Sequence, residues 1–263
     1  MQIDSKIIEN FLAGGEDYAK HWIFSQIRKD GTYLFEKPPR ECKEKLRAIY
    51  GQVNESLRHF VPYNQALIET LFPKWKVFEE GIHIVLAVGC PKPYDAMTRE
   101  HDGIEYLFFD LVRFLEYKEN GADICGVIHS MITHEFIHYC IHNDYSMSSE
   151  KSYVEKMANL VFDEGFAHLL SYNENIAKID FSLVIEEHYK TAMEKLERAL
   201  KETDVKRQQS CLERAGCGNF WEKYGAICGM LYLASKQKQL TEIYQAGPLE
   251  MIKNMGLRKA DRQ

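Results

Sequence analysis

Residues 122–142, ADICGVIHSMITHEFIHYCIH, decide the fold of this chain. The segment is apolar nearly all the way around a helical wheel, which is typical of a helix buried in the protein interior. Its few polar side chains would lie in apolar surroundings, where burial without partners costs on the order of several kcal/mol. The sequence therefore predicts a central buried helix whose polar residues are there for chemistry.

The segments that flank this helix differ in kind. Upstream, HIVLAVG (83–89) and IEYLFFD (104–110) are short runs of β-branched, aromatic and other apolar residues, which predict two strands of one small sheet. Before them, apolar residues at helical spacing predict a mostly helical region. Downstream, the helical candidates are 150–172, 182–203, 218–236 and a short pair within 239–254. The predicted fold class is α+β: a helical N-terminal region, a small β-sheet and a mainly helical C-terminal half.

The length of 263 residues fits one large domain or two closely packed ones. We expect a helical N-terminal region at residues 1–80 and a second domain at residues 81–263 that carries the chemistry, unless the two form one continuous domain. A chain of this length can bury a sizeable core without a structural metal. A metal ion would therefore serve chemistry rather than folding.

Composition excludes several classes of function. The net charge is −6, and no run of basic residues stands out, so we expect no nucleic-acid partner. The longest nearly apolar stretches, 81–90 and 224–235, are shorter than the roughly 20 residues that span a bilayer, and the first residues lack the pattern of a signal peptide. Seven scattered cysteines without a C-x-x-C pair indicate reduced thiols in a cytoplasmic protein, although Cys211 and Cys217 could form a redox or metal pair.

The central helix contains the motif His134-Glu135-Phe136-Ile137-His138. Two histidines four residues apart project from one face of a helix and can bind a single Zn²⁺. Glu135, beside the first histidine, is close enough to take a proton from a water molecule at the metal. We therefore expect one zinc ion per chain, with His134 and His138 as ligands and Glu135 as the general base.

A catalytic zinc site needs a third protein ligand. His142 lies about 12 Å along the helix axis from His134, too far for both to bind one ion. Asp144 has the spacing of the third ligand in metzincins, but Ile141 stands where those proteins need a glycine. Glu164 lies on the next predicted helix, beside small residues that permit close helix packing, and is the preferred third ligand.

The two motifs H134-E-F-I-H138 and E164-G-F-A together resemble those of the gluzincin superfamily of zinc metallopeptidases, and most closely its small bacterial members. The resemblance covers roughly residues 80–250. It implies a gluzincin-like catalytic domain in which Glu164 is the third ligand, Glu135 is the general base and a tyrosine or histidine of a later helix stabilises the oxyanion. We assign that last role to Tyr224, with Tyr153, Tyr172 and His168 as substitutes.

The sequence also departs from that pattern. The gap between the two motifs is longer than in zinc aminopeptidases, and no G-x-M-E-N segment precedes the central helix. Position 168 is His where thermolysin-like enzymes have a carboxylate that orients a zinc ligand. His168 would instead contact substrate or water, and Asp163 could take the orienting role.

The sequence therefore predicts a zinc-dependent hydrolase that cleaves a peptide or protein substrate of unknown identity. One alternative is a non-enzymatic binding or regulatory protein on the same scaffold. A second is a di-iron helical protein, because Glu135 and His138 form an E-x-x-H pair. That architecture needs a second E-x-x-H on a partner helix, and we expect none.

Overall fold

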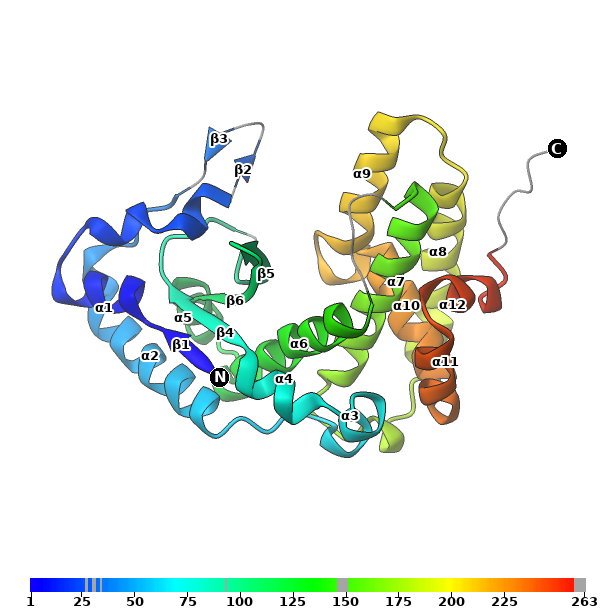
Figure 1. Ribbon diagram of the computed structural model, residues 1–263, viewed down its shortest axis with the longest axis horizontal. Helices are drawn as coiled ribbons and strands as arrows, with labels where there is room; N and C mark the ends of the chain where they lie inside the picture. The colour runs from blue at the N-terminus through cyan, green and yellow to red at the C-terminus, as the bar shows by residue number, and fades with distance from the viewer. Residues whose placement is uncertain (27, 30–31, 34, 93, 146–150, 258–263) are drawn as a thin grey trace. The chain divides into compact units, whose positions relative to one another are not determined.

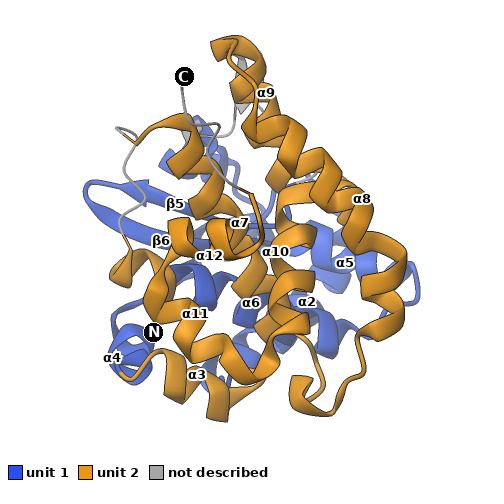
Figure 2. Cartoon of the chain, turned by 90° about the vertical axis from the view of Figure 1, so that its right-hand side faces the viewer, with its two compact units in different colours: residues 1–62, 74–139 blue, residues 63–73, 140–263 orange. Residues whose placement is uncertain are grey.

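The computed structural model describes residues 1–26, 28–29, 32–33, 35–92, 94–145 and 151–257, and its fold is α+β as predicted (Figure 1). The chain forms two compact units (Figure 2). Unit 1 comprises residues 1–62 and 74–139, and unit 2 comprises residues 63–73 and 140–263. The units therefore do not follow the expected division at residues 80 and 81. Their main boundary falls inside the central helix, α6 (Ile124–Asp144).

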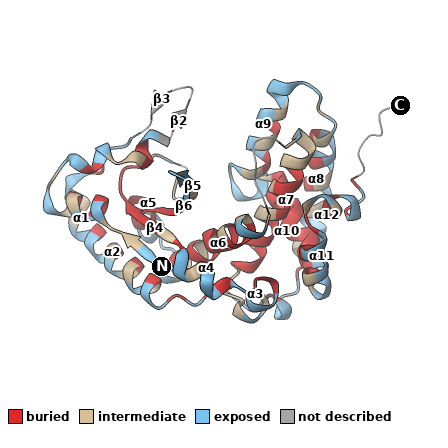
Figure 3. Ribbon diagram, in the orientation of Figure 1, coloured by how far each residue is buried: buried red, intermediate tan, exposed pale blue. Residues whose placement is uncertain are grey.

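Unit 1 is built on a four-stranded mixed sheet with the strand order β1-β4-β6-β5. The predicted strands are the parallel neighbours β4 (His83–Ala87) and β6 (Ile104–Asp110), which are largely buried (Figure 3). The edge strands β1 (Gln2–Asp4) and β5 (Ala96–His101) were not predicted. A separate hairpin joins β2 (Arg28–Lys29) to β3 (Thr32–Tyr33).

The helices of unit 1 bury apolar residues. The predicted helical character of the first 80 residues is confirmed by α1 (Lys6–Ala13), α2 (Lys43–Arg58) and α4 (Trp75–Gly81). These are accompanied by the 3₁₀ turns η1 (Asp17–Lys20), η2 (Trp22–Gln26) and η3 (Arg40–Cys42). The helix α5 (Leu111–Glu119) begins directly after β6, because the buried Asp110 carboxylate accepts hydrogen bonds from the N–H groups of Val112 and Arg113. The helix α1 packs against β4, and α2 packs against α1 and α5.

Unit 2 is helical and is organised around α10 (Tyr224–Ser235), in which every residue from Tyr224 to Ala234 is buried. It packs against α7 (Tyr153–Leu170), α8 (Ser182–Leu200) and α9 (Val205–Gly216). The remaining elements are α3 (Gln65–Leu71), α11 (Leu240–Ala246), α12 (Pro248–Asn254), η4 (Ile176–Lys178), η5 (Phe220–Glu222) and η6 (Gln237–Gln239).

The predicted helices of unit 2 are confirmed with shifted ends. The helix expected at 150–172 is α7, and residue 150 lies outside the described residues. The helix expected at 182–203 ends at Leu200, and the one expected at 218–236 begins only at Tyr224, after η5. The short pair within 239–254 is α11 and α12. In the part of the chain that the structure describes, no helix has the length and apolar character needed to cross a membrane.

Candidate metal centre

The rotation of α6 about its axis is fixed by aromatic packing in unit 1. The Phe136 ring contacts Phe60 and Trp75, with ring centroids 5.5 and 6.3 Å apart. At about 100° per residue, His134 and His138 lie on the face of the helix opposite Phe136. The apolar anchor on one face therefore directs the two imidazoles together to the other face.

The two histidines converge as the motif predicts. Their Nε2 atoms lie 3.0 Å apart, and the planes of the two rings are inclined at 84°. Two nitrogens bound to one tetrahedral zinc at about 2.0–2.1 Å would lie roughly 3.3 Å apart. The pair therefore fits a common metal ion with only a small adjustment of the side chains.

Glu135 occupies the position between these ligands along the helix. It is only 6% exposed, and His138 is also 6% exposed, whereas His134 is half-buried. A carboxylate in such surroundings is shielded from bulk water, which favours proton transfer to and from a bound reactant. This placement suits the general base that the sequence predicts.

In unit 2, Glu164 lies on α7 where that helix crosses α10 at very short range. A Cβ atom added to Gly229 of α10 would lie 2.1 Å from the Val161 carbonyl oxygen and 3.1 Å from the Gly165 Cα. The crossing of α7 and α10 therefore requires glycine at both 165 and 229. This agrees with the close helix packing expected beside Glu164. On the α9 side, the Glu164 Oε1 atom is 3.8 Å from the position that a Gly216 Cβ would occupy.

His168 is one turn after Glu164 on the same helix, and the structure places it against that carboxylate. Its Nε2 atom lies 3.4 Å from Glu164 Oε2, with side-chain exposures of 12% and 22%. The edge of the ring also packs against Phe220, with centroids 5.3 Å apart. His168 thus lies beside the Glu164 carboxylate, and its expected contact with substrate or water stays a prediction.

Asp163 contacts another histidine of α6. The His142 Nε2 atom lies 3.1 Å from Asp163 Oδ2, and both side chains are largely buried. Asp144, the alternative third ligand, accepts a hydrogen bond of 2.8 Å from the Tyr244 hydroxyl. The 3.1 Å contact means that the Asp163 carboxylate orients His142, the histidine that its distance from His134 excludes as a third zinc ligand.

The hydroxyl of Tyr224, the predicted oxyanion donor, is hydrogen-bonded inside unit 2. It donates to the Cys211 carbonyl oxygen at 2.6 Å, and burial, followed by the neighbouring Cys211, raises the pKa of Tyr224 to about 12. The substitute Tyr153 likewise donates to the Ala199 carbonyl oxygen at 2.7 Å, and the Tyr172 ring packs on Phe181. A catalytic role of Tyr224 would require this hydrogen bond to open.

Two other sequence expectations can be compared with the structure. A second E-x-x-H does occur, at Glu80 and His83, so the expectation of none is wrong. However, α4 ends at Gly81 and His83 begins β4, so the pair does not lie on a helix as a di-iron bundle requires. Of the proposed cysteine pair, Cys211 is buried and Cys217 is exposed.

Sequence reasoning missed Gly229 and the exposed aromatic pair Phe220 and Trp221. The Trp221 ring stacks on His188 with centroids 3.8 Å apart, although Trp221 itself is 44% exposed. The residues G-x-x-x-G at 225–229 were a readable signal for close packing of helices. No pattern in the sequence connects Trp221 with His188, because the two are joined only by the packing of η5 on α8.

Comparisons of the chain with protein-family models, curated proteins and solved structures found no match. The resemblance to gluzincins therefore rests on the two motifs and their order in the chain.

Proposed function

We propose that this protein is a zinc-dependent metallopeptidase of the gluzincin type, in which His134, His138 and Glu164 bind one zinc ion and Glu135 is the general base. The observation that carries the proposal is the convergence of the His134 and His138 Nε2 atoms, 3.0 Å apart, on one face of a helix in which Phe136 and Ile137 are fully buried. Two imidazoles and a neighbouring carboxylate form a donor set suited to zinc.

The continuity of α6 supports Glu164 as the third ligand. This helix is uninterrupted from Ile124 to Asp144, so His138 lies one turn before His142 on the same face. His142 contacts Asp163, and Glu164 is the next residue of α7. We infer from this relation that the Glu164 carboxylate can reach the ion bound by His134 and His138.

The roles of the protein's own side chains follow from their placement. A bound zinc ion would acidify a water molecule and polarise the carbonyl of the scissile peptide bond. Glu135 would accept the proton from the attacking water and deliver it to the leaving amine. His168 would hold the Glu164 carboxylate in one orientation, as groups behind a metal ligand commonly do.

The substrate class we propose is a peptide or protein, and the compartment is the cytoplasm. The cytoplasmic assignment is supported by the sequence, in which seven cysteines are scattered without a C-x-x-C pair. Neither a nucleic acid nor a membrane is a proposed partner, in keeping with the net charge of −6.

The proposal is tested by hydrolysis of a quenched-fluorescence peptide library with the wild type and with Glu135→Gln. We expect cleavage by the wild type and a loss of kcat of at least about 10³-fold in the variant, with the zinc content unchanged. Glu186→Ala, which alters an exposed glutamate of α8, serves as the control and should cleave like the wild type. Equal turnover by Glu135→Gln would exclude Glu135 as the base, and the absence of cleavage by zinc-loaded wild type would favour the non-enzymatic alternative.

A further inference from the structure

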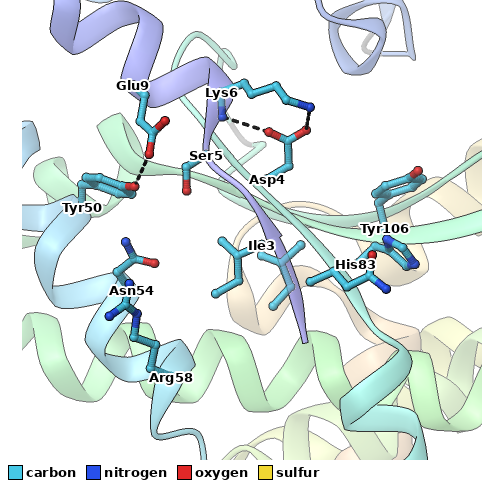
Figure 4. Close-up of a pocket in the computed structure, with 12 residues that line it drawn as sticks. Ile3, Asp4, Ser5, Lys6, Glu9, Tyr50, Asn54, Arg58, His83 and Tyr106 are labelled. Atoms are coloured by element: carbon cyan, nitrogen blue, oxygen red, sulfur yellow. Dashed lines mark hydrogen bonds and ion pairs between the residues drawn. The ribbon is translucent and has the colours of Figure 1, made fainter.

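A second potential binding site lies in unit 1, away from the histidines of α6. It is a cavity of about 570 Å³ beside β1, bordered by the start of α1 and by α2 (Figure 4). We call it the β1 groove and define it by Ile3, Ser5, Glu9, Tyr50, Asn54 and Arg58. Its volume is within the range of about 300–1,000 Å³ that small-molecule sites occupy.

One wall of the β1 groove is the open edge of the sheet. Among the residues that the structure describes, β1 pairs with β4 alone, in parallel, and Gln2 N–H donates to the Ile82 carbonyl oxygen at 2.8 Å. Since successive residues of a strand direct their N–H and C=O groups to opposite sides, those of Ile3 point away from β4 into the groove. Such an edge is a template for one more strand.

The opposite wall is one face of α2. Tyr50, Asn54 and Arg58 follow one another at intervals of four residues and therefore lie in a row along the helix. Figure 4 shows this row facing β1, with the apolar side chain of Ile3 between the two walls. Over the residues that the structure describes, neither the Asn54 amide nor the Arg58 guanidinium has a hydrogen bond or ion pair within the protein.

The two ends of the groove carry opposite charges. At one end, the Glu9 carboxylate is held by the Tyr50 hydroxyl at 2.8 Å. At the other end is the Arg58 guanidinium (Figure 4). The nearby Lys6 is already paired with Asp4, at 3.3 Å, so it does not neutralise Glu9. The groove thus presents an anionic end and a cationic end joined by an unpaired strand edge.

The spacing of these ends sets the length of the ligand. Tyr50 and Arg58 are eight residues apart on α2, which corresponds to about 12 Å at 1.5 Å per residue. An extended chain advances about 3.4 Å per residue, so three or four residues cover that distance. With its ammonium group at Glu9 and its carboxylate at Arg58, such a chain would run antiparallel to β1, the direction that gives the better-aligned hydrogen bonds.

We propose that the β1 groove binds a short extended peptide with free termini, three or four residues long, as an added antiparallel strand. The peptide exchanges main-chain hydrogen bonds with Ile3, its carboxylate is bound by Arg58, and its ammonium group is bound by Glu9. The site requires no metal and is separate from the proposed zinc centre.

The test is isothermal titration calorimetry of tetra-alanine into the full chain carrying Glu135→Gln, so that hydrolysis cannot consume the peptide, with and without a chelator. We expect saturable binding at one site per chain that the chelator does not change. Arg58→Gln should weaken it about tenfold or more, because a charge-assisted hydrogen bond to the carboxylate is lost. The matched control Arg47→Gln, on the same helix but outside the groove, should bind as tightly as the parent.

The main-chain contact is tested separately. Ile3→Pro removes the N–H group that faces the groove without removing a ladder bond to β4, and it should weaken binding, whereas Ile3→Ala keeps that N–H group. The amidated, acetylated tetrapeptide should bind Arg58→Gln and the parent equally. The proposal is overturned by the absence of saturable binding at millimolar peptide, by equal affinity of Arg58→Gln and the parent for tetra-alanine, or by binding that disappears with the chelator.

Discussion

The contact between Gly229 and Gly165 gives a quantitative prediction about the helix that carries Glu164. In Gly229→Ala, the new methyl carbon would lie 2.1 Å from the Val161 carbonyl oxygen. Ordinary carbon–oxygen contacts are no shorter than about 3.3 Å, so α7 and α10 would have to separate by roughly 1 Å. The obstacle is the backbone of α7, so it cannot be relieved by a side-chain rotation.

The energetic consequence combines two opposing effects. Overpacking of this kind costs up to about 3 kcal/mol. The higher helix propensity of alanine offsets about 1 kcal/mol of that cost. We therefore expect a net loss of roughly 2 kcal/mol in the free energy of unfolding, which lowers Tm by about 4–8 °C.

A control for the helix propensity is available in the same chain. Gly51 lies in the exposed middle of α2, and a Cβ atom added there meets nothing within 4 Å. Gly51→Ala should therefore stabilise the protein by up to about 1 kcal/mol. The assay is thermal unfolding followed by circular dichroism. A Gly229→Ala variant as stable as the wild type, or stabilised like Gly51→Ala, would refute the close crossing of α7 and α10.

Further predictions concern Asp110, His168 and Gly216. Burial raises the pKa of Asp110 to about 6. Between about pH 4 and 6 the folded protein therefore keeps a proton on Asp110 that the unfolded chain has lost. The free energy of unfolding contributed by Asp110 should fall as pH rises through this range. Urea denaturation should show this decline in the wild type relative to Asp110→Asn, and parallel pH profiles would contradict it. His168→Ala should weaken zinc binding about tenfold or more, as measured by competition with a chromogenic chelator, whereas the control His188→Ala should not. Equal zinc affinities of His168→Ala and the wild type would exclude the supporting role of His168. Gly216→Leu should also weaken zinc binding, because its side chain would occupy the space beside the Glu164 carboxylate, and an unchanged affinity would show that this space is not needed.

Local sequence patterns predicted the elements whose structure is decided by nearby residues. The strands at 83–87 and 104–110 are rich in apolar residues, and their parallel pairing accompanies burial of 84–87 and 107–110. The helix α6 is apolar on nearly every face, and α7 begins with a capping box formed by Ser152 and Glu155. These signals are independent of distant contacts.

The missed elements depend on partners far away in the sequence. The strand β1 has three residues and exists because Ile3 lies beside Ile84, which is 81 positions later. The strand β5 has the polar sequence AMTREH, and only its pairing with β6 makes it a strand. The helix α9 buries only Cys211 and Ala215, too few apolar residues for a clear helical pattern.

The candidate sites likewise contain features set by local sequence and features set by distant packing. The His134 and His138 pair is a local property of one helix and could be predicted from spacing alone. The contact of His168 with Glu164 is also local, because the two residues are four positions apart. The gluzincin pattern did not predict it, because thermolysin-like enzymes have a carboxylate in place of His168. The opposed charges of Glu9 and Arg58 at the two ends of the β1 groove could not be predicted, because only the packing of α1 and α2 beside β1 brings both side chains to one groove.

The zinc ion proposed to be held by His134, His138 and Glu164 can be tested by measuring the metal content of the purified chain. Mass spectrometry on protein prepared without added metal or chelator should find one zinc ion per chain in the wild type and in Glu186→Ala, and little or none in Glu164→Ala. Iron in place of zinc, no metal in the wild type, or full zinc occupancy in Glu164→Ala would contradict the assignment.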